Sequence, residues 1–247
     1  MTRERVEYGS LRCLVCDQVP EGQQPELIVF LCHGFGAPGT DLVPFADELT
    51  SLRPEIAGRV RFVFPEAPLE LDEFGMPGGR AWWLLNVDLL IKAAESGQFR
   101  DLADNRPEGI DSAAASLKAA IVAARAAAGG LPMDRVALGG FSQGAMLTTD
   151  VALQGDEAPA GLIVLSGTFL SRPDWERAAP TRAGLPVLQS HGRQDPILPF
   201  TAAERLRDLF VAANMTVDFH AFNGPHTIPY EAVQAMADFV VNRLPAE

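Results

Sequence analysis

A serine lies between two secondary-structure patterns, in the stretch GGFSQG at residues 139–144. The run before it, RVALGG, is strand-like, and the run after it, AMLTTDVALQ, is helix-prone. A serine on a sharp strand-to-helix turn is typical of a nucleophile elbow, which exposes the hydroxyl. Gly140 and Gly144 fit this geometry because the turn leaves no room for side chains on either side of Ser142. An ordinary glycine-rich connection has the same pattern, so the interpretation depends on partners elsewhere.

A serine hydroxyl is a poor nucleophile unless a base removes its proton. When the nucleophile lies on such an elbow, the acid and then the histidine follow it along the chain. Among the four histidines, His33 precedes the serine, and His220 shares a strand face with Asp218 in TVDFHAF. His226 instead follows that strand in the turn-rich stretch FNGPHTIP. We therefore predict that His226 is the base, at the sheet edge where α/β folds bind ligands.

An acid is expected after another strand and before this histidine. Asp195 meets both conditions in LPVLQSHGRQDPILPF, and Pro196 keeps it out of helical geometry. Its carboxylate would orient the imidazole of His226 and stabilise the imidazolium. Asp174, in SRPDWER, is the alternative acid, although it lies further from a strand end. His191 and Asp195 together lack the spacing of a zinc site, so no metal is predicted.

Two backbone N–H groups are predicted to stabilise negative charge that develops on a substrate oxygen. The N–H of Gln143 lies at the start of the helix that follows the serine, where the helix dipole adds to the effect. The second donor is the N–H of Phe35, in LIVFLCHGFGAPG, because Gly34 and Gly36 allow a backbone path that directs it inward. A plain glycine-rich loop is the alternative reading of this stretch.

A long stretch at about residues 65–106 interrupts the regular pattern of strands and helices. It mixes turn residues with Trp82, Trp83 and Leu84, in GGRAWWLL. Long excursions in compact domains are usually functional. We predict a lid or pocket wall here, with these three residues contacting the substrate; packing of both tryptophans into the core is the alternative.

Apolar, strand-like runs alternate with helical patterns along the chain. The runs are LRCLVC, ELIVFLC, RVRFVF, DRVALGG, AGLIVLSG, LPVLQSH and TVDFHAF. The helical patterns include TDLVPFADELTSL, DSAAASLKAAIVAARAAAGG, TAAERLRDLFVAANM and YEAVQAMADFVVNRL. Asp111 is the predicted N-cap of the alanine-rich helix, which should stop at Gly129 and Gly130. The alternation predicts one α/β domain over residues 1–247, with a mostly parallel sheet covered by helices on both faces.

Composition narrows the classes of protein. The 247 residues carry a formal net charge of −12, with no block of Lys and Arg, which disfavours nucleic acid as a partner. No apolar run is long enough for a membrane span, and the N-terminus lacks the core of a signal peptide, so a cytoplasmic location is expected. Cys13 and Cys16 form a C-x-x-C pattern, but strand alternation would place their thiols on opposite faces. We expect reduced structural cysteines and no redox or zinc site.

The chain resembles the phospholipase/carboxylesterase family of serine α/β hydrolases. The resemblance is carried by HGFGAPG, FPEAP, GGRAWW, EGI, GGFSQGAM, LSGTFL, PVLQSHGRQDPILP and FNGPHTIP, between Leu27 and the C-terminus. It implies an α/β-hydrolase fold with Asp195 and His226 at the positions of the family's acid and base. Ala37 departs from the family, which often has an Asp there, and GTDLVPF lacks the family's Trp.

The resemblance implies a serine carboxylesterase that needs no cofactor and acts through an acyl-enzyme. We expect a small ester with a short to medium acyl chain as substrate, and no stable membrane insertion. The alternatives are an acyl-protein thioesterase, a lysophospholipase, or a non-catalytic ligand receptor on the same fold. A homodimer is left open.

Overall fold

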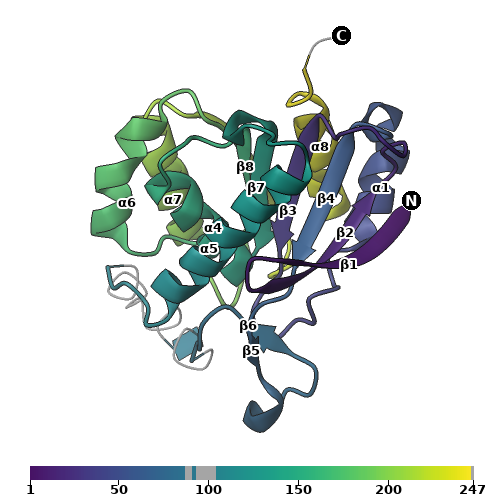
Figure 1. The fold of residues 1–247 in the computed structure, drawn as a ribbon. Helices are drawn as coiled ribbons and strands as arrows, with labels where there is room; N and C mark the ends of the chain where they lie inside the picture. The colour runs from purple at the N-terminus through teal and green to yellow at the C-terminus, as the bar shows by residue number, and fades with distance from the viewer. Residues whose placement is uncertain (87–90, 93–103, 246–247) are drawn as a thin grey trace.

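The computed structural model describes residues 1–86, 91–92 and 104–245. The strands are β1 (Thr2–Tyr8), β2 (Leu11–Asp17), β3 (Leu27–Cys32), β4 (Val60–Pro65), β5 (Leu69–Glu70), β6 (Arg80–Ala81), β7 (Val136–Phe141), β8 (Gly161–Leu165), β9 (Pro186–Gly192) and β10 (Thr216–Phe222). Eight of them form one sheet in the order β1-β2-β4-β3-β7-β8-β9-β10, and β5 pairs with β6 apart from it (Figure 1).

The large sheet is mostly parallel, as predicted. Only the pairs β1–β2 and β2–β4 run antiparallel in it. Every residue of β3 and β8 is buried, which explains their uninterrupted apolar sequences. The chain leaves β3 to one side through β4 and returns through β7 on the other side. The strand order therefore reverses between β3 and β7, which is where open α/β sheets bind ligands.

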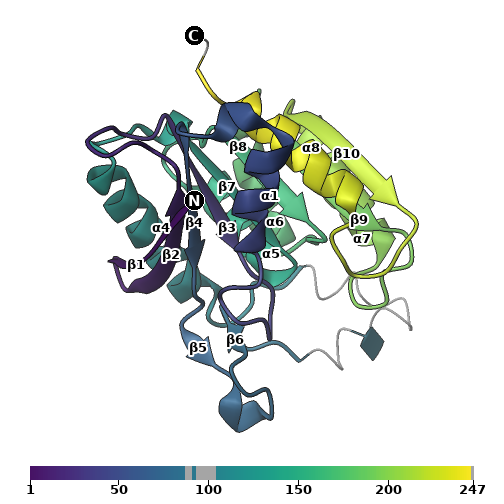
Figure 2. The same cartoon turned by 90° about the vertical axis from the view of Figure 1, so that its right-hand side faces the viewer.

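Helices cover both faces of the sheet, which confirms the predicted α/β-hydrolase architecture (Figures 1 and 2). The helices are α1 (Pro44–Leu52), α4 (Ile110–Ala127), α5 (Gln143–Gln154), α6 (Arg172–Ala178), α7 (Phe200–Ala212) and α8 (Tyr230–Val241). The short 3-10 helices are η1 (Pro54–Ile56), η2 (Asp72–Phe74), η3 (Met133–Arg135) and η4 (Ala179–Arg182). Helices α1 and α8 pack on one face and α4 to α7 on the other. No helix in the described part of the chain is long and apolar enough to cross a bilayer.

The predicted strands are all present, whereas three local features differ from the prediction. The highly charged β1 and the short α6 were not predicted. The prediction that Asp111 caps α4 is wrong: Gly109, with a φ of 90°, occupies the N-cap position. Asp111 lies in the first helical turn instead, where Arg106 binds its carboxylate. Helix α4 does end before Gly129 and Gly130, which have φ values of 71° and 81°.

The two cysteines of the C-x-x-C pattern lie on β2 and are both buried. Cys13 packs into the core on the α4–α7 face, and Cys16 packs into the core on the α1–α8 face. Burial raises the pKa of Cys13 to about 12, so its thiol stays protonated. The prediction that the thiols point to opposite faces is confirmed, and this arrangement cannot form a disulfide between them.

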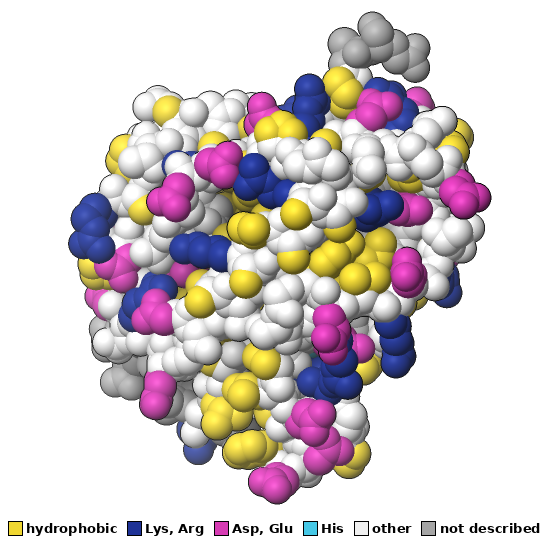
Figure 3. Space-filling view, viewed as in Figure 1, with side chains coloured by type: hydrophobic (Ala, Val, Ile, Leu, Met, Phe, Trp, Pro, Cys, Tyr) yellow, Lys and Arg dark blue, Asp and Glu magenta, His cyan; other side chains and the backbone are white. Residues whose placement is uncertain are grey.

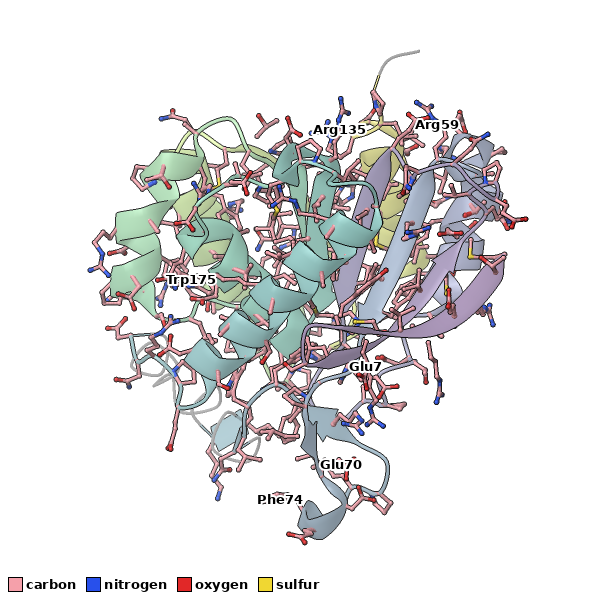
Figure 4. The ribbon with its side chains drawn as sticks, in the orientation of Figure 1. Glu7, Arg59, Glu70, Phe74, Arg135 and Trp175 are labelled. Carbon is pink, nitrogen blue, oxygen red and sulfur yellow. The ribbon has the colours of Figure 1, made fainter. Side chains whose placement is uncertain are left out.

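The first half of the predicted excursion is an ordered projection rather than an irregular loop. Residues 69–81, which we call the arm, contain β5, η2 and β6, and they project beyond the carboxyl ends of β3 and β4 (Figure 1). Phe74 and Glu70 lie on the projecting part of the arm (Figure 4). Phe74 is 60% exposed. Much of the second half of the excursion lies outside the described residues.

Acidic and basic side chains are interspersed over the face seen in Figure 3, with no large patch of either sign.

The buried carboxylate of Asp150 has partners from two other segments of the chain. Asp150, on the buried helix α5, accepts hydrogen bonds at 2.9 and 3.2 Å from Arg106 and at 2.9 Å from the indole of Trp175. These bonds fix the end of the excursion against α5.

Candidate functional site

Ser142 lies alone between the end of β7 and the start of α5, with a φ of 54° and a ψ of −117°. This conformation is strained for a residue with a side chain. The chain on both sides of the serine is closely packed: a Cβ on Gly140 would lie 2.6 Å from the Cys32 carbonyl oxygen, and one on Gly144 would lie 2.1 Å from it. The two glycines therefore let α5 start directly against β3, as expected for an elbow.

The loop between β3 and α1 passes directly over this turn. A Cβ on Gly34 would lie 3.3 Å from the Cβ of Ser142, so the backbone that leads into Phe35 is in contact with the serine. Both Phe35 and Ser142 line the same cavity. The geometry thus brings the backbone of Phe35 to the start of α5, where the first N–H groups have no partner within the helix.

His33 braces this loop rather than serving as a base. Its Nδ1–H donates to the Gly34 carbonyl at 2.9 Å, and its Nε2 accepts from the Ala67 N–H at 3.0 Å. The indole of Trp82 donates to the His33 carbonyl at 3.0 Å. Burial lowers the pKa of His33, which keeps the ring neutral and suited to one donor and one acceptor role.

Gln143 connects the elbow to the excursion through its fully buried side chain. Its Oε1 accepts from the N–H of Trp82 at 3.0 Å, and its Nε2 donates to the carbonyl of Trp83 at 2.7 Å. The sequence suggested a role only for the backbone of this residue. Its amide satisfies two buried main-chain groups that would otherwise have no partner, so it fixes the position of the excursion relative to Ser142.

Asp195 and His226 are brought together by the loops after β9 and β10. The His226 Nδ1–H donates to Oδ2 of Asp195 at 2.6 Å, while Oδ1 accepts from the N–H groups of Ile197 and Leu198, each at 2.9 Å. Burial alone would raise the pKa of Asp195. The hydrogen bonds from His191 and His226, with that from Leu198, outweigh burial and hold this pKa well below its usual range.

His191 is a second histidine on the same carboxylate, a contact that the sequence did not reveal. It is fully buried, and its Nε2–H donates to the Leu198 carbonyl at 2.9 Å and lies 3.3 Å from Oδ2 of Asp195. Its Nδ1 has no hydrogen-bond partner, which identifies Nε2 as the protonated nitrogen. In the sequence, the i, i+4 spacing of His191 and Asp195 across the end of β9 could have indicated this contact.

Ser142 and His226 line one cavity of about 300 Å³, and they share no hydrogen bond in this structure. Such bonds are often long in the absence of substrate. The ring of Phe141 packs against the imidazole of His226, with centroids 4.8 Å apart. The cavity is lined by Gly34, Phe35, Ala37, Asp41, Met76, Leu85, Phe141, Ser142, Met146, Ile197, Leu198 and His226.

The residues predicted to contact the substrate do not line this cavity. Trp82 and Trp83 are 2% and 1% exposed and pack into the core. The main chains of both are bonded to the buried Gln143 side chain, and the Trp82 indole donates to the His33 carbonyl. Leu84 is 54% exposed on the outside. Their neighbour Leu85 is the residue of this stretch that lines the cavity. The alternative reading, packing of both tryptophans into the core, describes the structure.

The remaining candidates lie away from the cavity. Asp174 is in α6, 3.9 Å from Arg106, and His220 lies 2.9 Å from Asp218 on β10. Within the described ranges, no three His, Cys, Asp or Glu side chains gather as metal ligands would. A larger cavity, of about 490 Å³, lies between α6 and α7, but none of the predicted site residues lines it.

The comparisons with known proteins place the chain in a family. The family model described as Phospholipase/Carboxylesterase matches residues 16–243. The chain is 27% identical to acyl-protein thioesterase 1 of Mycosarcoma maydis over 92% of its own length and 95% of the relative. It is 30% identical to acyl-protein thioesterase 1 of Eremothecium gossypii, over 76% and 75% of the two lengths.

Solved structures agree with the sequence comparison. The crystal structure of esterase PE8 covers 93% of the chain, with 97% of its own length matched, at a TM-score of 0.76 and 26% identity. A carboxylesterase from Mesorhizobium loti shares the fold at a TM-score of 0.72 and 18% identity, over 96% and 98% of the two chains. The chain therefore belongs to the phospholipase/carboxylesterase family of serine hydrolases.

Proposed function

We propose that the protein is a serine carboxylesterase in which Ser142 is the nucleophile, His226 the base and Asp195 the acid that orients it. The observation that carries this proposal is the 2.6 Å bond between His226 and Asp195 beside the strained serine turn. With Nδ1–H held by the carboxylate, Nε2 of His226 is left free to accept the serine proton.

The mechanism follows from the positions of these groups. Ser142 Oγ attacks the ester carbonyl while His226 takes its proton, and the N–H groups of Phe35 and Gln143 stabilise the oxyanion. The protonated His226 then gives its proton to the leaving alcohol, which leaves an acyl-enzyme. Water activated by His226 releases the acid and restores Ser142.

Labelling with a fluorophosphonate tests the assignment of the nucleophile. We expect one covalent adduct on Ser142, detected by peptide mass spectrometry, and no adduct in Ser142→Ala. Labelling of another serine, or none at all, would favour a non-catalytic receptor on the same fold.

The size of the cavity supports esters with short to medium acyl chains over long lipids. Its volume of about 300 Å³ lies at the lower end of the range for small-molecule sites. We expect an optimum between roughly C2 and C8, since each buried methylene contributes about 0.8 kcal/mol until the cavity is filled. A panel of p-nitrophenyl esters and matched thioesters measures both the chain length and the ester or thioester preference.

Leu85→Ala should change the chain-length profile, whereas Leu84→Ala, a matched change on the exposed neighbour, should not. The thioesterase alternative is favoured by the similarity to acyl-protein thioesterase 1. An optimum at C16, with thioesters turned over faster than esters, would support that alternative over the carboxylesterase. A cytoplasmic location remains a prediction.

A further inference from the structure

The cavity beside Ser142 contains a carboxylate that the proposed mechanism does not use. Asp41 lies between β3 and α1, in the loop that also contains Phe35. With His226, it is one of two ionisable side chains among the described residues that line the cavity. Most of the other lining residues are apolar. A fixed negative charge is therefore placed where the substrate would bind.

Asp41 is an exposed residue where it lines the cavity, although the protein around it removes part of its hydration. Burial is the main cause that raises its pKa to about 6, and the backbone N–H groups of Asp41 and Leu42 oppose this rise in part. No cation among the described residues contributes to this balance. The side chain is thus mostly ionised at neutral pH, although it is less well solvated than a surface carboxylate.

Two buried carboxylates of the described chain, Asp17 and Asp150, each have an arginine partner. Asp17 lies 2.6 Å from Arg61, and Asp150 lies 2.9 Å from Arg106. This pairing is expected, since an enclosed charge without a partner is costly. Asp41 keeps exposed surface at the cavity and has no cationic partner among the described residues, so a ligand in the cavity could supply one.

The surroundings of Asp41 also suit a cation. Phe35 and Phe141 both line the cavity, and aromatic faces attract ammonium groups. The apolar lining weakens screening by water, so a charge pair formed inside the cavity is stronger than one on the surface. A quaternary or protonated ammonium group meets both conditions.

We propose that Asp41 forms a subsite for a cationic group of the substrate, so that the preferred substrates are esters that carry an ammonium group. This proposal rests on the proposed esterase function of Ser142. The ester carbonyl would lie at Ser142, and the ammonium group would lie against Asp41 and the aromatic rings.

Two esters of nearly identical shape test this proposal. Butyrylcholine carries a trimethylammonium group, and 3,3-dimethylbutyl butyrate has a neutral tert-butyl group in its place. We expect kcat/KM to favour the cationic ester by about tenfold in the wild-type protein, as for a partly desolvated cation beside a carboxylate and aromatic rings. In Asp41→Asn the ratio should fall to about one. In Glu55→Gln, which removes an exposed surface charge, the ratio should remain as in wild type.

The control separates a subsite from the attraction of any cation by the net charge of −12. A ratio that falls equally in Glu55→Gln and Asp41→Asn would overturn the proposal, because it would indicate a general field effect. A ratio near one in the wild-type protein would also overturn it. If Ser142→Ala still abolished hydrolysis of both esters, the esterase function would stand nonetheless.

Binding without turnover provides a readout that does not depend on hydrolysis. In an NMR titration, choline should bind more tightly than 3,3-dimethylbutan-1-ol to the wild-type protein, and this difference should disappear in Asp41→Asn. If neither ester is hydrolysed but choline binds through Asp41, the esterase function fails and the cationic subsite stands. Equal binding of the two alcohols would overturn the subsite.

Discussion

Two carboxylates lie in the loops around Ser142, and their pKa values are shifted in opposite directions. Asp195 has both oxygens occupied by backbone and histidine N–H groups, and its pKa is held well below the usual range. Asp41 has no cationic partner in the part of the chain that the structure describes, and its pKa is raised to about 6. The loops after β9 and β10 supply N–H groups that stabilise the charge of Asp195. The loop between β3 and α1 leaves a charge for something else to bind.

The largest expected effect concerns Ser142 and His226, the base that Asp195 orients. Ser142→Ala and His226→Ala should each lower kcat by about 10⁴-fold or more, because the first removes the nucleophile and the second removes the base. Circular dichroism should show that both variants remain folded. A His226→Ala variant with near-normal turnover, together with an inactive His220→Ala variant, would show that the base is misassigned.

The second prediction concerns the backbone that fixes the serine. Gly144→Ala would place a Cβ 2.1 Å from the Cys32 carbonyl oxygen, so either α5 or β3 must move. We expect a loss of more than about 3 kcal/mol in the free energy of unfolding, at the upper end of overpacking effects, and little activity.

Gly184→Ala is the control for a glycine-to-alanine change without steric contact, because Gly184 has a φ of 83° and open space around the added Cβ. It should cost only about 1–2 kcal/mol, the penalty for a side chain in a left-handed conformation. Equal losses in the two variants, measured by urea unfolding, would mean that steric contact with β3 does not constrain the elbow.

These contrasts explain which residues could be predicted from the sequence. Ser142, Asp195 and His226 each follow an apolar strand, and the carboxyl ends of parallel strands meet at one edge, so local patterns placed all three there. Trp82 and Trp83 could not be placed in this way. Their positions depend on bonds to Gln143 and His33, which are distant in the sequence.

The same reasoning applies to the elements that were missed. Strand β1 is charged on both faces of its sequence and becomes a strand only because β2 pairs with it along its whole length. Asp41 was visible in GTDLVPF, but its exposure to the cavity depends on how that loop folds over Ser142. Local sequence patterns therefore predicted the strands and the proposed chemistry, and tertiary contacts determined the walls of the cavity.

The third prediction concerns His191, which we expect to act as a positioning residue through Asp195. His191→Phe removes the N–H that lies 3.3 Å from Oδ2 and leaves the Leu198 carbonyl without its partner. We expect roughly a tenfold loss in kcat/KM, comparable to about 1.4 kcal/mol for a lost hydrogen bond to a charged group. His191→Gln, which retains an N–H donor, should recover most of this loss.

A pH profile distinguishes positioning from a simple loss of packing. Without the His191 N–H, more negative charge remains on Asp195, and this charge favours the protonated form of His226. Higher pH is then needed to free the base, so the acid limb of kcat/KM should move to higher pH in His191→Phe. If the acid limb stays at the same pH and kcat/KM is lower at every pH, His191 contributes only packing.

The smallest expected effect tests the two carboxylates directly, through the pH dependence of stability. The folded-state pKa of Asp195 lies below its unfolded value of about 3.9, so its contribution is present at neutral pH and is lost as pH falls below about 4. The folded-state pKa of Asp41 is raised to about 6, so its contribution is present below about pH 4 and is lost as pH rises through 6.

Relative to wild type, Asp41→Asn should therefore become more stable between pH 4 and 7, by no more than about 1 kcal/mol because water still reaches the group. Asp195→Asn should show the opposite trend, with its deficit greatest at neutral pH and smaller as pH falls below 4. Urea unfolding of the three proteins from pH 3 to 8 measures both slopes, and parallel curves for the two variants would refute the contrast between the two loops.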